Sequence, residues 1–154
     1  MKTILVGYDG TAPAERALTR AAELARAFGS KVVVVSVSAP ERPVIDGGAF
    51  GLTPYYYPAT DISARSDEAV WQQHRERVQE LFAGFDVPVE FAGVSGRPAE
   101  EIVDVADEHD ADLIVVGTRE PGFLERLLGG SVSEGVARRA HCDVLIVHSP
   151  EQAD

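Results

Sequence analysis

Short apolar runs rich in valine and isoleucine alternate along the chain with segments whose apolar residues recur every three to four positions. Residues 3–8 and 32–38 are runs of the first kind, which are typical of strands buried on both faces of a parallel sheet. Between them, small apolar residues recur at helical spacing, with charged residues on the opposite side. This alternation restricts the chain to α/β folds in which crossover helices cover a parallel sheet.

The remaining elements continue the same pattern. Three further strands are predicted over residues 87–94, 112–117 and 143–148. A helix is predicted in each gap that follows a strand, ending at Gly29, spanning about 64–83, starting at Pro98 and spanning 131–140. Residues 39–62, with four prolines, are expected to form a long loop. The sequence therefore predicts one doubly wound α/β domain over residues 1–150 and a short tail over 151–154.

The charge balance opposes two classes of partner. Fourteen Lys and Arg residues against 25 Asp and Glu residues give a formal charge of −11, which repels nucleic acid and anionic membrane surfaces. No apolar run approaches the roughly 20 residues that a membrane-spanning helix requires. Because Cys142 is the single cysteine, an internal disulfide cannot form and a reducing cytoplasm is expected. We therefore expect a protein that binds neither nucleic acid nor membranes.

Ligands of open parallel sheets bind beyond the carboxyl ends of the strands, where the winding reverses. Two segments of this chain hold such positions, residues 7–11 after the first strand and residues 117–133 after the fourth. In the second segment, Gly130 permits close backbone approach, and Ser131 begins a helix whose N–H groups attract anions. Arg119 adds positive charge. The residues alone leave two interpretations open, a phosphate site or a Gly-Ser pair that only caps a helix.

The same segment resembles the nucleotide-binding signature of the universal stress protein family. In that signature a glycine, two residues, a second glycine, nine residues and a Gly-Ser or Gly-Thr pair wrap the phosphates of ATP. Gly117, Gly130 and Ser131 match the pattern. The opening ILVGYDGT, the strand VVVVSV, the segment GRPAEEIVDVADEHDADLIVVGTR and the closing GSVSEGVARRAHCDVLIVH are also similar to the family. The resemblance covers nearly the whole chain except the loop over residues 40–62.

The resemblance implies a Rossmann-like fold of the adenine nucleotide alpha hydrolase type. Five parallel strands in the order 3-2-1-4-5 and four helices on both faces are expected. Asp9 and Val37 match the family positions that contact adenine and ribose. The implied phosphate-binding segment comprises Gly117, Thr118, Arg119, Gly130, Ser131, Val132 and Ser133. Asp9 also has a second interpretation, because aspartates at strand-to-helix junctions often form turns and caps.

The sequence departs from the family pattern at one position of the signature. The second glycine of the pattern is replaced here by Glu120. A carboxylate about 4 Å from a phosphate oxygen would repel it by about 1 kcal/mol in bulk water and about 4 kcal/mol at an effective dielectric constant of 20. Gly122 and Arg119 are close enough in sequence to offset this change.

The resemblance implies a cytoplasmic stress-response regulator that binds ATP, AMP or ADP. Mg²⁺ would come with the nucleotide, and no metal site of the protein's own is expected. ATP hydrolysis is expected to be slow at most, and the protein is not expected to be an enzyme, since no general base and no P-loop lysine is apparent. A homodimer through residues 143–148 is expected, because this strand should lie at an edge of the sheet. The alternative is a dimeric scaffold of the same fold that acts without nucleotide.

Other catalytic and nucleotide-binding patterns are missing. No lysine follows residues 130–135 as a P-loop requires, and residues 7–10 lack the glycine spacing of a dinucleotide-binding fingerprint. A response regulator would need an aspartate and a lysine where this chain has Ser95 and His148. No spacing of His, Cys and carboxylates predicts a metal site. His74 lies on the apolar stripe of its helix and is expected to pack or to be partly exposed.

Overall fold

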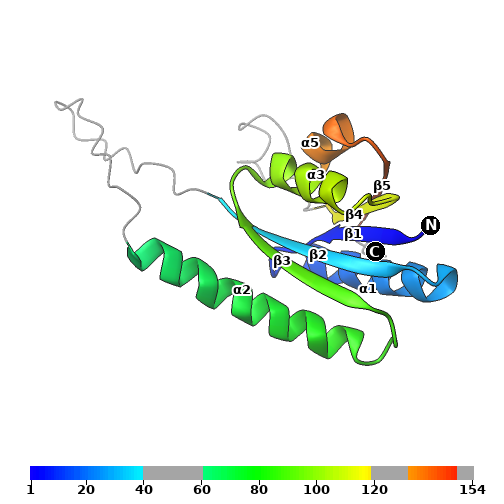
Figure 1. Ribbon diagram of the computed structural model, residues 1–154, viewed down its shortest axis with the longest axis horizontal. Coiled ribbons are helices and arrows are strands. Elements are labelled where there is room, and N and C mark those ends of the chain that lie inside the picture. Colours follow the sequence, from blue (N-terminus) through cyan, green and yellow to red (C-terminus); the bar gives the residue numbers. More distant parts are fainter. Residues whose placement is uncertain (40–60, 119–131, 149–154) are drawn as a thin grey trace, which may run out of the picture.

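The computed structural model describes residues 1–39, 61–118 and 132–148, and of residues 61–66 it describes the backbone alone. Strands and helices alternate along these residues (Figure 1). In chain order they are β1 (Thr3–Gly7), α1 (Ala12–Phe28), β2 (Lys31–Ser38), α2 (Asp61–Phe82), β3 (Val89–Ser95), α3 (Pro98–Glu108), β4 (Leu113–Gly117), α5 (Val132–Arg139) and β5 (Asp143–Val147).

The five strands form one parallel sheet in the order β3-β2-β1-β4-β5. β1 lies at the centre and pairs with β2 on one side and β4 on the other, so the winding reverses between β1 and β4. The predicted α/β fold and strand order are therefore confirmed. The predicted edge position of the last strand is confirmed as well, because among the described residues β5 pairs with β4 alone.

Helix α1 begins and ends where the sequence predicts. Thr11 has an extended backbone, and its hydroxyl accepts a hydrogen bond from the Ala14 N–H at 3.4 Å. Pro13 occupies the first turn, where its missing N–H interrupts no helical hydrogen bond. Gly29 ends the helix with a φ of 66°, in the left-handed region that glycine adopts readily. These caps fix the first turn of α1 beside the carboxyl end of β1.

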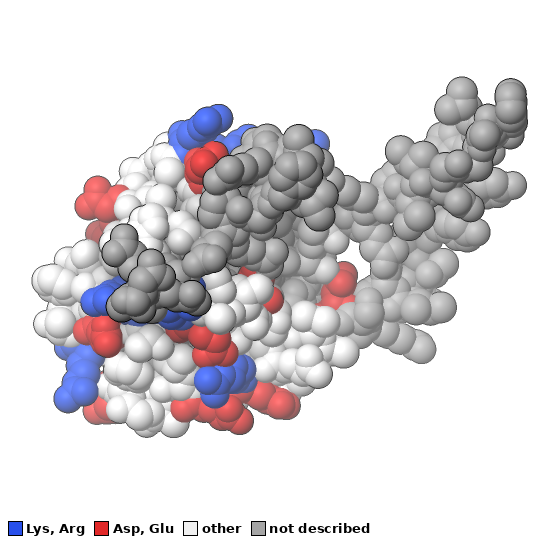
Figure 2. Space-filling model, turned by 180° about the vertical axis from the view of Figure 1, so that it is seen from behind, with Lys and Arg blue, Asp and Glu red and all other residues white. Residues whose placement is uncertain are grey.

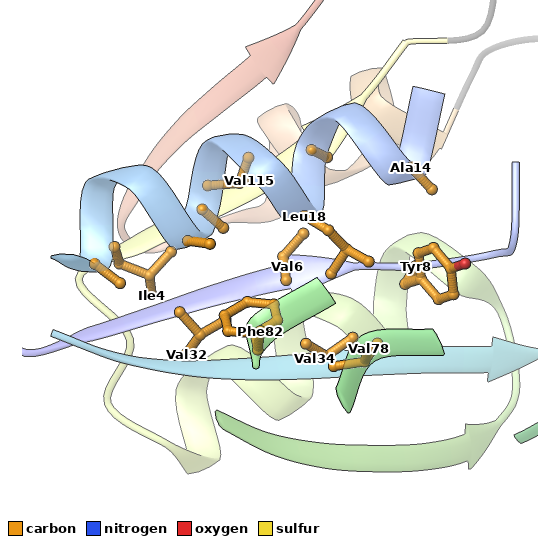
Figure 3. Packing of buried hydrophobic residues seen from close by; sticks show 14 of the residues in the cluster. Ile4, Val6, Tyr8, Ala14, Leu18, Val32, Val34, Val78, Phe82 and Val115 are labelled. Carbon is orange, nitrogen blue, oxygen red and sulfur yellow. The ribbon is translucent and has the colours of Figure 1, made fainter. Parts of the chain in front are cut away.

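Alternate residues of the central strands pack on opposite faces of the sheet. Ile4 and Val6 lie in a cluster that helices α1 and α2 cover, whereas Leu5 faces a second cluster under α3 and α5. Figure 1 shows these two helix pairs on opposite sides of the sheet. Figure 3 shows Tyr8 and Ala14 at one end of the first cluster and Ile4 at the other. The two-residue period of the strand runs thus builds a core on both faces.

Helix α2 carries the predicted apolar stripe. Val78 and Phe82 are buried against the sheet, and Leu81 is partly buried beside them. Trp71 lies so close to Gly93 of β3 that a Cβ on this glycine would come 2.5 Å from the ring. A larger residue at position 93 would therefore push α2 away from β3.

Two boundaries differ from the prediction by more than one residue. α2 begins at Asp61, about one turn before the predicted start, so the loop expected over residues 39–62 ends earlier. The apolar stripe that located this helix lies in its later turns, and periodicity does not define a first turn. β3 begins at Val89, two residues after the predicted start. Of that expected loop, residues 40–60 lie outside the described residues, as do residues 119–131 and 149–154.

Acidic and basic side chains are interspersed on the molecular face that Figure 2 presents. Among the described residues, several acidic and basic side chains pair, as in the contacts of Arg20 with Glu23 at 3.4 Å and of Lys31 with Glu90 at 3.4 Å. Within residues 1–39, 61–118 and 132–148, no helix is both long and apolar enough to span a bilayer.

Candidate nucleotide-binding site

A cavity of about 380 Å³ lies at the carboxyl edge of the sheet, where the winding reverses between β1 and β4. This volume falls within the range of about 300–1,000 Å³ that is usual for small-molecule sites. Strand ends, the loop after β1 and the first turns of three helices line it, with Gly7, Tyr8, Asp9, Thr11, Pro13, Ala14, Val35, Val37, Pro98, Ile102, Val116, Gly117, Val132 and Ser133 as the described residues. Most of these side chains are apolar, so the cavity suits a ligand with an apolar part.

Two glycines at the strand ends let helices approach the sheet closely. A Cβ on Gly117 would come 2.3 Å from the carbonyl oxygen of Pro13, so α1 begins directly against the end of β4. A Cβ on Gly7 would come 3.0 Å from Cδ1 of Ile102 on the opposite face. Gly117 therefore has a packing role that is independent of any ligand.

The loop after β1 contains hydrogen bonds of its own. One carboxylate oxygen of Asp9, Oδ1, accepts from the Thr11 N–H at 3.0 Å and from the Thr11 hydroxyl at 2.5 Å. Gly10 between them has a φ of 80°, which glycine adopts without the strain that a side chain brings. The turn that the sequence left open as a second role for Asp9 is thus present, while Asp9 also lines the cavity.

Three helices direct their N-termini at this edge. The cavity is lined by Thr11 and Pro13 at the start of α1, by Pro98 at the start of α3 and by Val132 and Ser133 at the start of α5. A helix N-terminus carries a partial positive charge and N–H groups without helical partners. The arrangement favours an anionic group at the rim of the cavity.

Five of the nine predicted site residues line the cavity, namely Asp9, Val37, Gly117, Val132 and Ser133. Thr118 directs both of its donors at β5, because its N–H donates to the Val147 carbonyl oxygen at 3.0 Å and its hydroxyl donates to the same oxygen at 3.5 Å. It is not among the described lining residues. The predicted residues Arg119, Gly130 and Ser131 lie outside the described residues, as does Glu120.

The apolar walls of the cavity were not among the site residues predicted from the sequence. Val35, Ile102 and Val116 lie within strand and helix patterns that indicated only core positions. Val116 lies near the carboxyl end of β4, Val35 lies in register with Gly7 at the end of β1, and Ile102 lies one turn into α3. These positions could have identified them. Pro13 and Pro98 carry the same signal, because each begins a helix at the ligand edge of the sheet.

Beside the cavity, Tyr8 belongs to a chain of hydrogen bonds that runs away from it. The Tyr8 hydroxyl donates to Glu15 Oε1 at 2.9 Å, and Arg77 Nε donates to the same oxygen at 2.8 Å. Burial, followed by the Glu15 carboxylate, raises the pKa of Tyr8. The bond from Arg77 lowers the pKa of Glu15. Tyr8 therefore stays protonated at neutral pH and does not provide a base.

The described His, Cys and acidic side chains outside the cavity do not form a metal site or a catalytic site. Within the described part of the chain, no three His, Cys, Asp or Glu side chains gather as metal ligands. His141 pairs through Nδ1 with Asp107 at 2.9 Å, and both side chains are exposed. Burial, with nearby carboxylates, raises the pKa of Cys142, which makes this thiol a weaker nucleophile at neutral pH.

Sequence comparison identifies the family. A sequence model of the universal stress protein family matches residues 1–148. The chain belongs to the universal stress protein family. The resemblance carried by the loop after β4, by the strand runs and by the C-terminal segment is thereby confirmed.

Curated universal stress proteins of distant organisms align over nearly the whole chain. One from Thermus aquaticus is 37% identical over 148 residues, which cover 95% of this chain and 98% of the relative. Another, from Methanocaldococcus jannaschii, is 32% identical over 151 residues, which cover 98% of this chain and 84% of the relative.

Two solved universal stress protein structures with bound nucleotide are similar in fold. One, in complex with cAMP, has a TM-score of 0.67 and 30% sequence identity, with 96% of each chain covered. The other, from Archaeoglobus fulgidus in complex with dAMP, has a TM-score of 0.62 and 27% identity, with 95% of this chain and 97% of that chain covered.

Proposed function

We propose that this universal stress protein binds an adenine nucleotide, AMP, ADP or ATP, in the cavity at the carboxyl edge of the sheet. The observation that carries the proposal is the convergence of three helix N-termini on an apolar cavity of about 380 Å³. An apolar cavity suits a purine ring, and helix N-termini suit its phosphates. The cAMP and dAMP complexes of similar universal stress proteins support the choice of adenine.

In the proposed orientation, the base and ribose lie near Asp9 and Val37, and the phosphates lie near the start of α5. The charges favour this direction over the reverse one. A phosphate beside the Asp9 carboxylate would be repelled, whereas the first turn of α5, with the backbone groups of Val132 and Ser133, carries the partial positive charge of a helix N-terminus. In this proposal Gly130 and Ser131 precede these groups in the chain and extend the same phosphate-binding segment, and Arg119 is assigned to it from the sequence resemblance.

We further propose that the protein acts as a cytoplasmic stress-response regulator and hydrolyses ATP slowly at most, with any Mg²⁺ brought by the nucleotide. Among the described residues that line the cavity, Tyr8 and Asp9 are the titratable ones. Tyr8 stays protonated because burial raises its pKa, and Asp9 Oδ1 is engaged by Thr11. A water molecule in the cavity would therefore lack an efficient general base among these groups.

Val132→Asp tests the site with little risk to the fold. Val132 is 43% exposed, lies in the first turn of α5 and lines the cavity. A carboxylate in a first helical turn is favourable for the helix but repels a phosphate by about 1–4 kcal/mol at about 4 Å, depending on solvent screening. We expect AMP and ATP to bind at least about fivefold more weakly in calorimetry, and adenosine to bind as before.

Val132→Asn is the matched control, because it has the shape of the aspartate without its charge. It should bind AMP much as the wild type does. Equal losses for AMP and adenosine in the aspartate variant would contradict the proposed orientation. Absence of AMP and ATP binding by the wild type at millimolar concentration would refute nucleotide binding and favour the nucleotide-independent scaffold.

The edge strand β5 could form a dimer interface. A dimer is part of both hypotheses, the nucleotide-binding protein and the nucleotide-independent scaffold. The inner edge of β5 pairs with β4, and its side chains are partly buried in both core clusters. An apolar edge strand tends to pair with another chain. We propose that two copies pair through β5 about a two-fold axis, which satisfies the outer backbone groups of both strands.

A further inference from the structure

His74 of α2 is held in a defined orientation next to the loop after β1. Its Nδ1 forms a hydrogen bond of 2.7 Å with the hydroxyl of Ser36, a side chain of β2 that is 2% exposed. Its ring meets the ring of Tyr8 edge to face, with 4.9 Å between the ring centres. A buried partner on one side and an aromatic ring on another leave this imidazole little rotational freedom.

This orientation directs the other ring nitrogen at Gly10. A Cβ added to Gly10 would come 2.9 Å from Nε2 of His74, so no side chain fits between the imidazole and the loop. Gly10 is not among the described lining residues, whereas its neighbours Asp9 and Thr11 are. His74 therefore approaches the loop at Gly10, and neither of these two residues is among the described lining residues of the cavity.

We propose that His74 is a positioning residue for the nucleotide site, which holds the Asp9–Thr11 loop in place through Gly10 and makes its position depend on α2. This inference rests on the proposed function. The loop presents Asp9 to the cavity through a turn that contains a glycine with a φ of 80°, and a glycine is free to adopt other conformations when its support is removed. Removing the Nε2 contact should therefore loosen the part of the cavity assigned to the base and ribose.

The groups around His74 keep its ring neutral at neutral pH. Tyr8 faces it from β1, Asp9 from the loop and the uncharged Ser36 from β2. Glu15 of α1 faces it only through the Tyr8 hydroxyl and is paired with Arg77, on the same helix as His74. Burial lowers the pKa of His74, and the Asp9 carboxylate partly opposes this shift. On acidification the His74 ring gains a positive charge near the Asp9 carboxylate, and the attraction between these two charges changes how strongly His74 holds the loop.

Two neutral replacements separate the two ring nitrogens. In His74→Asn the side-chain amide ends near the position of Nδ1, which keeps a partner for Ser36 and removes the contact with Gly10. In His74→Gln the longer amide reaches about as far as Nε2. We expect His74→Gln to bind AMP within about twofold of the wild type, and His74→Asn to bind it about fivefold more weakly, at the lower end of coupling between linked sites.

The pH profile adds a readout that loss of packing would not change. Adenosine lacks the phosphate of AMP, which itself titrates near pH 6. The affinity of the wild type for adenosine should therefore change as the pH falls below about 6.5, the ordinary pKa of histidine, and the glutamine variant should lack this change. Equal affinities of the two variants, or the same pH profile in the wild type and the glutamine variant, would overturn the positioning role.

A measurement without nucleotide separates this inference from the proposed function. In a ¹⁵N-labelled protein, the Gly10 amide resonance should shift with the titration of the His74 ring, and the shift should vanish in His74→Gln. A Gly10 amide that ignores this titration would overturn the contact even if AMP binds. Absence of AMP binding with a normal Gly10 shift would refute the nucleotide site and leave the contact between α2 and the loop standing.

Discussion

Gly117→Ala separates a packing role from a phosphate-binding role at the end of β4. The new Cβ would lie 2.3 Å from the Pro13 carbonyl oxygen and 2.6 Å from its carbonyl carbon. Both are backbone atoms in the capped first turn of α1, so neither moves without shifting the helix. Gly117 is not among the glycines with positive φ, so alanine brings no backbone strain and the effect is steric.

The expected magnitude follows from two opposing terms. Overpacking a rigid site costs about 1–3 kcal/mol, and the backbone contact places this case near about 3 kcal/mol. Replacement of glycine by alanine stabilises by about 0.4–1 kcal/mol through the unfolded chain. The net loss is about 2 kcal/mol, which for a domain of this size lowers the melting temperature by about 4–8 °C.

Urea and thermal unfolding measure this loss, with Gly84→Ala as the matched control. A Cβ on Gly84 would meet nothing within 4 Å, so the control should be neutral or slightly stabilised. If Gly117→Ala unfolds like the control, α1 does not hold Pro13 rigidly against β4 and the reasoning is wrong. Loss of AMP binding at unchanged stability would instead assign Gly117 to the phosphates.

Two further predictions concern the N-terminal strand and the edge strand. Asp112 accepts hydrogen bonds from the backbone N–H groups of Lys2 at 2.6 Å and Thr3 at 3.0 Å, and these bonds lower its pKa. The Asp112 carboxylate contributes its full stabilisation of the fold above the ordinary aspartate pKa of about 3.9, and this contribution is lost as the pH falls through the lower pKa of the folded state. Asp112→Asn should therefore lower the urea midpoint at pH 7, and in acid the midpoints of the variant and the wild type should become equal. In β5 the Val147 carbonyl points at β4, so the N–H of Ile146 points away from β4, toward the proposed second copy. Because proline lacks this N–H, Ile146→Pro should convert the dimer to a monomer, which light scattering would detect. A wild type that is monomeric at high micromolar concentration would contradict the dimer.

The fold was predictable because each level of the sequence indicates the same answer. The valine run of β2 is typical of a strand in a sheet covered on both faces, and Val32 to Val35 are fully buried there. Pro13 and Gly29 delimit α1 by backbone chemistry alone. Such signals are local, so a single sequence contains them.

The candidate site was predictable only in part, because its roles depend on contacts between distant segments. The spacing of the loop after β4 indicated that Gly117 binds phosphate. The same spacing gives no sign that the Pro13 carbonyl packs against Gly117. The bond between Ser36 and His74 joins residues 38 positions apart. The helix stripe placed His74 against the core, but which of its nitrogens faces the loop depends on how α2 lies across the sheet.

The acidity of the chain and the anionic ligand proposed for it are physically compatible. With a formal charge of −11, the protein repels polyanions at long range, but at physiological ionic strength this repulsion is screened beyond about 8 Å. Helix N-termini act within their first turn and need no lysine. First turns of α1, α3 and α5 line one cavity, because every crossover helix of a doubly wound sheet starts at the same edge. The fold therefore supplies locally the positive potential that the composition lacks. A small anion that enters the cavity experiences this potential, whereas a nucleic acid would have to lie along an acidic surface.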